Sequence, residues 1–134
     1  MVRITDLGTL LKSMKPRVAD GEFVFCSVSE TLFSSLKTKP LLVFREEEGI
    51  TLILERRAAE ANGLPYSSVW GLITLTVHSG LTAVGFLAAI TNKLAEAGIS
   101  VNVASAYYHD HLFIPVDKMD TAMRLLKELS ESEL

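Results

Sequence analysis

Hydrophobic positions change their spacing several times along the chain, and the first pattern is helical. Within residues 5–14 the apolar side chains recur at helical intervals, at Leu7, Leu10, Leu11 and Met14. This spacing predicts an amphipathic helix that begins after Thr5 or Asp6 and ends before Pro16.

The chain up to residue 66 then alternates short strand patterns with short helix patterns. Runs of aromatic and β-branched residues predict strands at 23–28, 41–45 and 50–55. Helices are expected over 29–36, capped by Ser29, and over "RRAAEANG", which closes on an asparagine and a glycine. The segment "EEEG" between the last two strands predicts a turn that uses its glycine.

The second half of the chain repeats this order with clearer signals. It predicts a strand over 70–77, a helix over 82–97, strands over 99–108 and 112–116, and an amphipathic helix over 117–129. The tail, residues 130–134, is expected to fray.

Both halves therefore follow the order strand, helix, strand, turn, strand, helix. The repeat predicts an α+β protein of two tandem units, residues 1–66 and 67–134, each with an antiparallel sheet. In this alignment "YHDH" takes the place of "EEEG", so a hairpin turn is expected there.

Composition narrows the functional classes. The chain has 134 residues, of which 49% are hydrophobic, and a formal net charge of −3, so a globular protein is expected and a nucleic-acid-binding surface is not. Neither a long uncharged apolar run nor a signal-peptide pattern is present, so we expect a cytoplasmic protein with no membrane partner. The single cysteine, Cys26, excludes an internal disulfide and predicts a small buried hydrophobe. No cofactor is predicted.

The segment "YYHDHLF" carries the most reactive side chains. Alternation along an extended chain places His109 and His111 on one face and Asp110 on the other. A zinc site needs three or four ligands, and His78 is expected at the far end of another strand, so no metal site is predicted. No nucleophile motif accompanies these histidines, so no catalytic residue is predicted either. We expect a solvated turn in which Asp110 accepts from nearby backbone amides.

The segment "VHSGLTAVGF" predicts a different chemistry. A strand ends, Gly80 allows a tight turn, Ser79 or Thr82 can cap, and a helix begins with unpaired amides that attract a carboxylate. Gly85 early in that helix costs about 1 kcal/mol compared with alanine, which indicates a close neighbour, either a ligand or a packed strand. Asn102, in the apolar run "ISVNVAS", offers both a donor and an acceptor, although an edge strand facing water explains it equally.

The order βαββα, the glycine turn after the strand and the phrase "LAEAGISVN" resemble the ACT domain family, in particular small stand-alone tandem ACT proteins of bacteria and the ACT repeats of aspartate kinases. The likeness covers residues 20–129 and is strongest over 69–116. It implies a ferredoxin-like fold with βαββα(β) subdomains and an amino acid bound between the loop after the first strand and the start of the second strand, often across paired domains. The residues so implied are Ser79, Gly80, Leu81, Thr82, Ala83, Val84, Gly85, Ile99, Ser100, Val101 and Asn102.

One departure from the family pattern concerns the sheet. A full ACT domain has a fourth strand, but none follows the helix predicted over 117–129. Residues 2–4, a shared strand or a partner subunit are the expected sources.

Three functional hypotheses follow. The first is a non-catalytic regulatory protein that binds a small ligand, an amino acid, with its carboxylate on the amides of residues 80–84 and its amine on Asn102. The second is an interaction module that pairs through an exposed sheet edge without any ligand, and a homodimer is expected in either case. The third is a small enzyme that uses His109 or His111.

Overall fold

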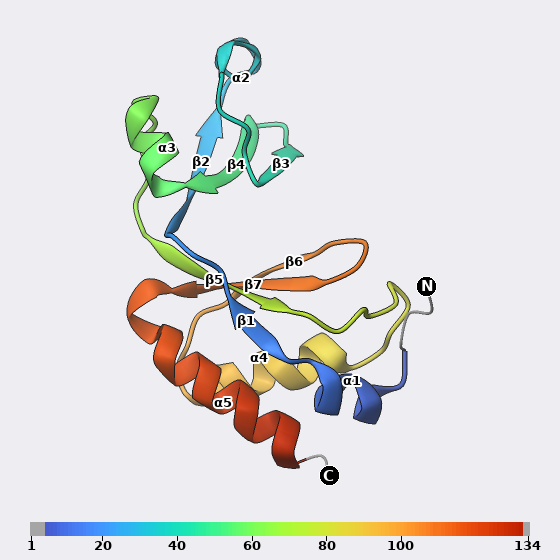
Figure 1. Cartoon of the computed structure of the whole chain (residues 1–134). Coiled ribbons are helices and arrows are strands. Elements are labelled where there is room, and N and C mark those ends of the chain that lie inside the picture. Colours follow the sequence, from blue (N-terminus) through green and yellow to red (C-terminus); the bar gives the residue numbers. More distant parts are fainter. Residues whose placement is uncertain (1–4, 133–134) are drawn as a thin grey trace. The chain divides into compact units, whose positions relative to one another are not determined.

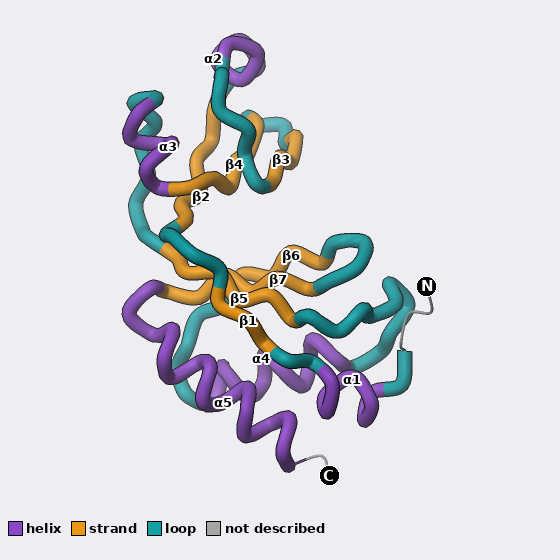
Figure 2. Tube along the Cα trace, viewed as in Figure 1, coloured by secondary structure: helices purple, strands orange, loops and turns teal. Residues whose placement is uncertain are grey.

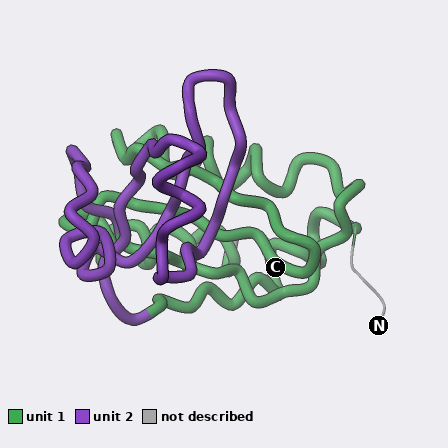
Figure 3. The backbone as a smooth tube through the Cα atoms, turned by 90° about the horizontal axis from the view of Figure 1, so that it is seen from above, with its two compact units in different colours: residues 1–19, 71–134 green, residues 20–70 purple. Residues whose placement is uncertain are grey.

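The computed structural model describes residues 5–132. The chain forms two compact units, which we name the central unit, residues 20–70, and the terminal unit, residues 1–19 with 71–134 (Figure 3). The domain boundary expected between residues 66 and 67 stays a prediction. The compact units themselves divide the chain elsewhere, because the N-terminal segment packs with the C-terminal half.

The central unit contains every element that its sequence pattern predicts. Its elements are β2 (Phe23–Val28), α2 (Glu30–Ser35), β3 (Leu42–Arg45), β4 (Ile50–Glu55) and α3 (Arg56–Ala61). The strands pair antiparallel in the order β3-β4-β2, and Glu46 and Gly49 close the hairpin between β3 and β4. Apolar side chains of β2 and β4 alternate into one core, where Cys26 is buried as expected.

The terminal unit packs three helices against one sheet. Its elements are α1 (Leu7–Ser13), β1 (Pro16–Val18), β5 (Trp70–Leu75), α4 (Phe86–Glu96), β6 (Asn102–Ser105), β7 (Asp110–Pro115), the 3-10 turn η1 (Val116–Lys118) and α5 (Met119–Ser132). Its strand order is β1-β5-β7-β6. Helices α1, α4 and α5 contact one another and cover one face of this sheet (Figure 1). Their apolar stripes and the inward side chains of β5 and β7 form a single buried cluster.

The fourth strand of the terminal unit comes from a segment that the sequence pattern left as a loop. Residues 16–18 form β1 and pair antiparallel with β5, so that Pro16 lies opposite Leu75 and Val18 opposite Ile73. Residues 2–4, one of the expected sources, lie outside the described residues. So short a strand shows no alternation, and its proline is tolerated because it stands at the first position of an edge strand.

The helix predicted over 82–97 begins later, at Phe86. Residues 80–83 form a turn instead, in which Ala83 N–H donates to the Gly80 carbonyl at 3.0 Å. Neither Ser79 nor Thr82 caps the helix. The N-cap is Gly85, with a φ of +88°, a left-handed conformation that favours glycine.

Other boundaries also differ from expectation. The strands predicted over 70–77 and 99–108 are shorter, at β5 and β6. The tail expected to fray is helical as far as Ser132, and Ser130 Oγ donates to the Lys12 carbonyl at 3.2 Å, which ties the end of α5 to α1.

Candidate functional site

A small pocket lies in the terminal unit where α4 begins. Its volume is about 140 Å³, and we name it the α4 pocket. Three segments line it: the loop after β5, the first turn of α4, and the end of β6 with the start of β7. The lining residues are Ser79, Gly80, Leu81, Ala83, Gly85, Phe86, Leu87, Ala88, Ser105, Ala106 and Asp110. Figure 2 draws all loops in teal, among them the long loop between β5 and α4 and the β6–β7 turn.

The first turn of α4 presents unpaired backbone donors to this pocket. The Gly85 N-cap has no side chain to accept from them, and the first hydrogen bond of the helix joins Ala89 N–H to the Gly85 carbonyl at 3.0 Å. The amides of Phe86, Leu87 and Ala88 therefore have no partner within the helix. Their dipoles make this wall of the pocket electropositive.

Asp110 places a carboxylate in the same pocket. The residue is only 6% exposed, and Ser79 Oγ, itself in a buried residue, donates to Asp110 Oδ2 at 3.1 Å. Within residues 5–132 no ion pair includes Asp110. The expectation of a solvated aspartate bonded to turn amides is therefore wrong. Alternation along β7 explains the burial, because Asp110, Leu112 and Ile114 share the face that packs on the core.

The histidines gather beside the hairpin. The turn itself spans residues 106–109 and is closed by the Ala106 amide, which donates to the His109 carbonyl at 2.9 Å. The turn expected at "YHDH", residues 108–111, therefore lies two positions earlier. His78 was expected far from this hairpin, but its ring centroid lies 4.8 Å from that of His109. The His109 and His111 centroids are 6.2 Å apart, on one side as alternation predicts.

His111 is half-buried, and its Nδ1 lies 2.9 Å from Thr74 Oγ1. Burial, followed by the nearby charge of His109, lowers the pKa of His111 below its ordinary value. The part of the chain that the structure describes holds no group of three or more His, Cys, Asp or Glu side chains arranged to hold a metal.

The structure brings together most of the predicted loop but not the predicted facing strand. Thr82 and Val84 do not line the α4 pocket, and Val84 is 81% exposed. None of the residues 99–102 lines it: Ile99 is buried in the core, Val101 packs against that core, and Ser100 and Asn102 are exposed. Asn102 stands at the start of β6, whereas Ser105 and Ala106 at its other end line the pocket.

Both parts of the chain match family models described as ACT domain, over residues 3–71 and 67–128. The chain belongs to the ACT domain family. This family is regulatory and binds small ligands, and the fold is of the ferredoxin-like type that its members share.

Solved structures agree with the fold. A Vibrio cholerae protein of unknown function, described as a possible transport protein, is 48% identical with a TM-score of 0.83, over 92% of this chain and 95% of that one. The ligand-free regulatory subunit of aspartate kinase from Thermus thermophilus is 8% identical with a TM-score of 0.69, over 88% and 98% of the two chains. An Agrobacterium tumefaciens protein is 14% identical with a TM-score of 0.67, over 86% and 87%. No curated protein matches, and no helix of residues 5–132 has the length and apolar character needed to cross a bilayer.

In the central unit, helix α2 takes the place that α4 takes in the terminal unit, but a side chain caps the N-terminus of α2. There Ser29 is the N-cap of α2, and its Oγ accepts from the Leu32 amide at 3.1 Å. The helix also follows β2 directly, without the long loop that precedes α4. The two ACT units therefore share an architecture but differ at this helix, because α2 has a serine cap whereas α4 has a glycine cap and opens onto a pocket.

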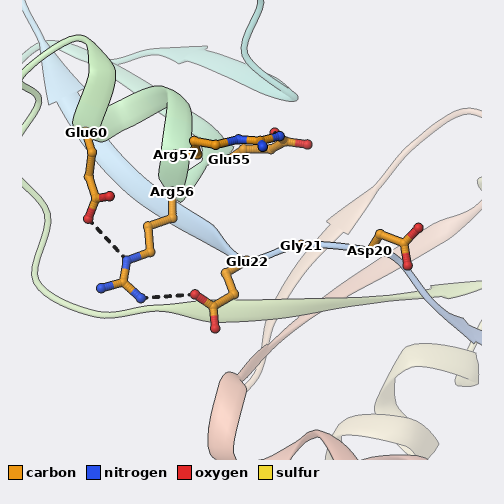
Figure 4. A pocket seen from close by; sticks show the side chains of 7 residues that line it. All are labelled: Asp20, Gly21, Glu22, Glu55, Arg56, Arg57 and Glu60. Carbon is orange, nitrogen blue, oxygen red and sulfur yellow. Dashed lines mark hydrogen bonds and ion pairs between the residues drawn. The ribbon is translucent and has the colours of Figure 1, made fainter.

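The central ACT unit has a larger, more open hollow of about 590 Å³. Figure 4 shows its lining: Asp20, Gly21, Glu22, Glu55, Arg56, Arg57 and Glu60. Its central cation is already paired, because the Arg56 guanidinium bonds Glu22 at 3.0 Å, Glu60 at 3.3 Å and the Tyr66 hydroxyl at 2.9 Å. Arg57 is paired with Glu55 at 3.6 Å. Both arginines of this surface are therefore already paired, so the α4 pocket is the better candidate site for a ligand carboxylate.

Proposed function

We propose that this ACT protein is a non-catalytic regulator that binds a small ligand, an amino acid, in the α4 pocket. The observation that carries the proposal is the start of α4, where no side chain caps the helix and which opens onto a pocket lined by a buried aspartate, Asp110. Membership of the ACT family supports a regulatory role. A cytoplasmic location is part of the proposal.

The ligand carboxylate would accept hydrogen bonds from the first amides of α4. Each residue from Phe86 to Ala88 lines the pocket and leaves its N–H free within the helix. The helix dipole adds about 0.3–2 kcal/mol to the binding of an anion at such a terminus. Gly80 and Gly85 have no side chains, so a ligand can approach the backbone closely.

The size of the α4 pocket suits a metabolite rather than a large cofactor. Its volume of about 140 Å³ lies well below the range of about 300–1,000 Å³ that drug-sized ligands occupy. The apolar part of the lining includes Leu81, Ala83 and Phe86, which can surround a short side chain.

The proposal assigns no contact to Asn102, because that residue lies outside the lining. Asn102→Ala is therefore a matched control for Gly80→Val, which places a branched side chain in the pocket. The test is a thermal-shift and calorimetric screen of the standard amino acids at millimolar concentrations. A ligand at 100 times its dissociation constant should stabilise the protein by about 2.7 kcal/mol. We expect Gly80→Val to abolish that shift and Asn102→Ala to keep it; absence of any shift with wild-type protein would refute the proposal.

A second proposal is self-association through a sheet edge. Strand β6 lies at the edge of the sheet of the terminal unit. Apolar side chains are exposed there: Val103 on β6 is 37% exposed, and in the adjacent turn Tyr107 is 58% and Tyr108 47% exposed. An open edge with apolar side chains favours pairing with another chain. Sedimentation equilibrium should reveal a concentration-dependent homodimer that Val103→Lys weakens. If dimerisation is the sole function, Gly80→Val leaves the association unchanged and no ligand binds.

A further inference from the structure

We infer that Asp110 makes the α4 pocket selective for ligands that carry a cationic nitrogen. This inference rests on the proposed function, because it concerns the ligand of the same pocket. It assigns a specificity-determining role to a side chain that the sequence pattern placed in a solvated turn.

Among the residues that the structure describes, no cationic side chain pairs with Asp110. Asp110 is 6% exposed, and Ser79 donates one hydrogen bond to one carboxylate oxygen, Oδ2. Among residues 5–132 no other side chain or amide hydrogen-bonds to this carboxylate, and no lysine or arginine pairs with it. A buried carboxylate is costly unless it is paired, and a single hydroxyl donor is a weak partner for it.

The neighbouring histidines do not provide that charge. His111 is the half-buried neighbour on β7, and its lowered pKa keeps it neutral near pH 7. Its Nδ1 is engaged with Thr74, and alternation along β7 directs it to the face opposite Asp110. His109 adjoins the rings of His78 and His111 on that same opposite side. The start of α4 lines the same pocket as Asp110.

The pocket thus combines an electropositive wall, the amides of α4, with a carboxylate wall, Asp110. A ligand with a carboxylate alone would gain the first contact but would meet a second negative charge at close range. A ligand with both a carboxylate and an ammonium group satisfies both walls. The α-ammonium of an amino acid and the side-chain ammonium of a basic amino acid offer the same chemistry, and the probes below separate them.

A purely structural role for Asp110 makes a different prediction. If the α4 dipole stabilises Asp110 in the empty pocket, Asp110→Asn lowers the stability of the ligand-free protein. If the charge of Asp110 is compensated only when a cationic ligand binds, the same isosteric substitution removes a poorly compensated charge. The ligand-free protein then keeps or gains stability.

The experiment is calorimetric titration of the full chain with matched probes. L-alanine and L-valine are compared with L-lactate and L-2-hydroxyisovalerate, which replace the α-ammonium with a hydroxyl. L-lysine is compared with 6-aminohexanoate, which keeps only the side-chain ammonium. The standard amino acids serve as the reference screen, and the variants are Asp110→Asn, Ser79→Ala and the control Asp117→Asn, an exposed acid in η1.

We expect wild-type protein to bind an amino acid at least about tenfold more tightly than its hydroxy-acid counterpart. Asp110→Asn should remove this ratio without lowering the ligand-free melting temperature, Ser79→Ala should reduce it, and Asp117→Asn should preserve it. Binding of 6-aminohexanoate as tight as that of L-lysine identifies the side-chain ammonium as the partner, and tight binding of L-alanine identifies the α-ammonium.

Three outcomes overturn the inference. Equal affinity for amino and hydroxy acids refutes the role of Asp110 while the proposed carboxylate site stands. An unchanged ratio in Asp110→Asn together with a lower ligand-free melting temperature assigns Asp110 a structural role. Absence of binding by every probe refutes the proposed function itself.

Discussion

Gly85 is the position where backbone conformation, helix capping and the candidate site meet. It is the N-cap of α4 with a φ of +88°, and a Cβ added there would lie 3.5 Å from Leu7 Cδ2, an ordinary van der Waals distance. Gly85→Ala therefore carries no steric clash, and its cost comes from the left-handed backbone alone. That conformation costs an L-residue about 1–2 kcal/mol.

Part of this cost is offset in the unfolded chain. Alanine reduces the conformational entropy of the unfolded state, which stabilises a protein by about 0.4–1 kcal/mol where the native backbone is compatible. Gly85→Ala should thus lower the free energy of unfolding by about 0.5–1.5 kcal/mol in total. Asparagine visits the left-handed region more readily than alanine, so Gly85→Asn should lose less.

The assay is urea unfolding followed by circular dichroism, with the slope compared between variants. Gly21→Ala is the matched control, because Gly21 has a φ of +90° with no atom within 4 Å of an added Cβ and lies outside the α4 pocket. Gly8→Ala is a control for which we expect the opposite effect. Gly8 lies inside α1 without a positive φ, so alanine there should raise the free energy of unfolding by about 0.5–1 kcal/mol. The reasoning is refuted if Gly85→Ala is as stable as wild type while Gly21→Ala is destabilised. It is also refuted if Gly85→Asn has a lower free energy of unfolding than Gly85→Ala.

Three further predictions test the packing and the electrostatics. Gly49→Ala should destabilise the protein by about 1–3 kcal/mol in urea, because its Cβ would stand 2.9 Å from Ser27 Oγ and 3.0 Å from the Val28 carbonyl oxygen, both on β2. A neutral result would contradict the close approach of the β3–β4 turn to β2. Leu10→Ala should cost about 2–5 kcal/mol, since this α1 side chain is 0% exposed within the core of the terminal unit; the exposed Leu7→Ala is its control, and an equal effect of both would place α1 outside that core. The pKa of His111 is lowered in the folded protein, so the unfolded chain binds the proton of this histidine more readily. The free energy of unfolding that His111 contributes should therefore fall as the pH drops below the ordinary pKa of 6.5 toward the folded pKa. Urea midpoints of wild type and His111→Asn, measured between pH 7.5 and pH 5, should converge as pH falls, and parallel curves would contradict this prediction.

The sequence predicted the elements of this fold well, because their signals are local. Helical spacing in α1 and α5, β-branched runs in β2 and β4, and the Ser29 cap of α2 each depend on neighbours within a few residues. The same local reading missed β1, whose three residues become a strand only because β5 lies beside them. It also placed the start of α4 too early, since a glycine N-cap carries no side-chain signal.

The candidate site was predicted in part for the same reason. The glycine loop and the free start of a helix are local features, and most of the predicted loop lines the α4 pocket. Its carboxylate was missed, although the alternation of Asp110 with Leu112 and Ile114 on β7 already indicated a core-facing side chain. The unusual place of Asn102 in an apolar strand predicts a ligand contact, but the pocket lies at the other end of β6.

The amino-acid sequence by itself determined which segments form helices and strands, which of their faces are apolar, and that two similar units follow one another. Only the tertiary structure decided that β1 supplies the fourth strand of the terminal unit, that His78 meets His109, and that Ser79 meets Asp110. The physical reason is the range of the interactions. Periodicity and caps arise between neighbours in the chain, whereas strand partners and pocket walls are chosen by the burial of surfaces that lie far apart in sequence.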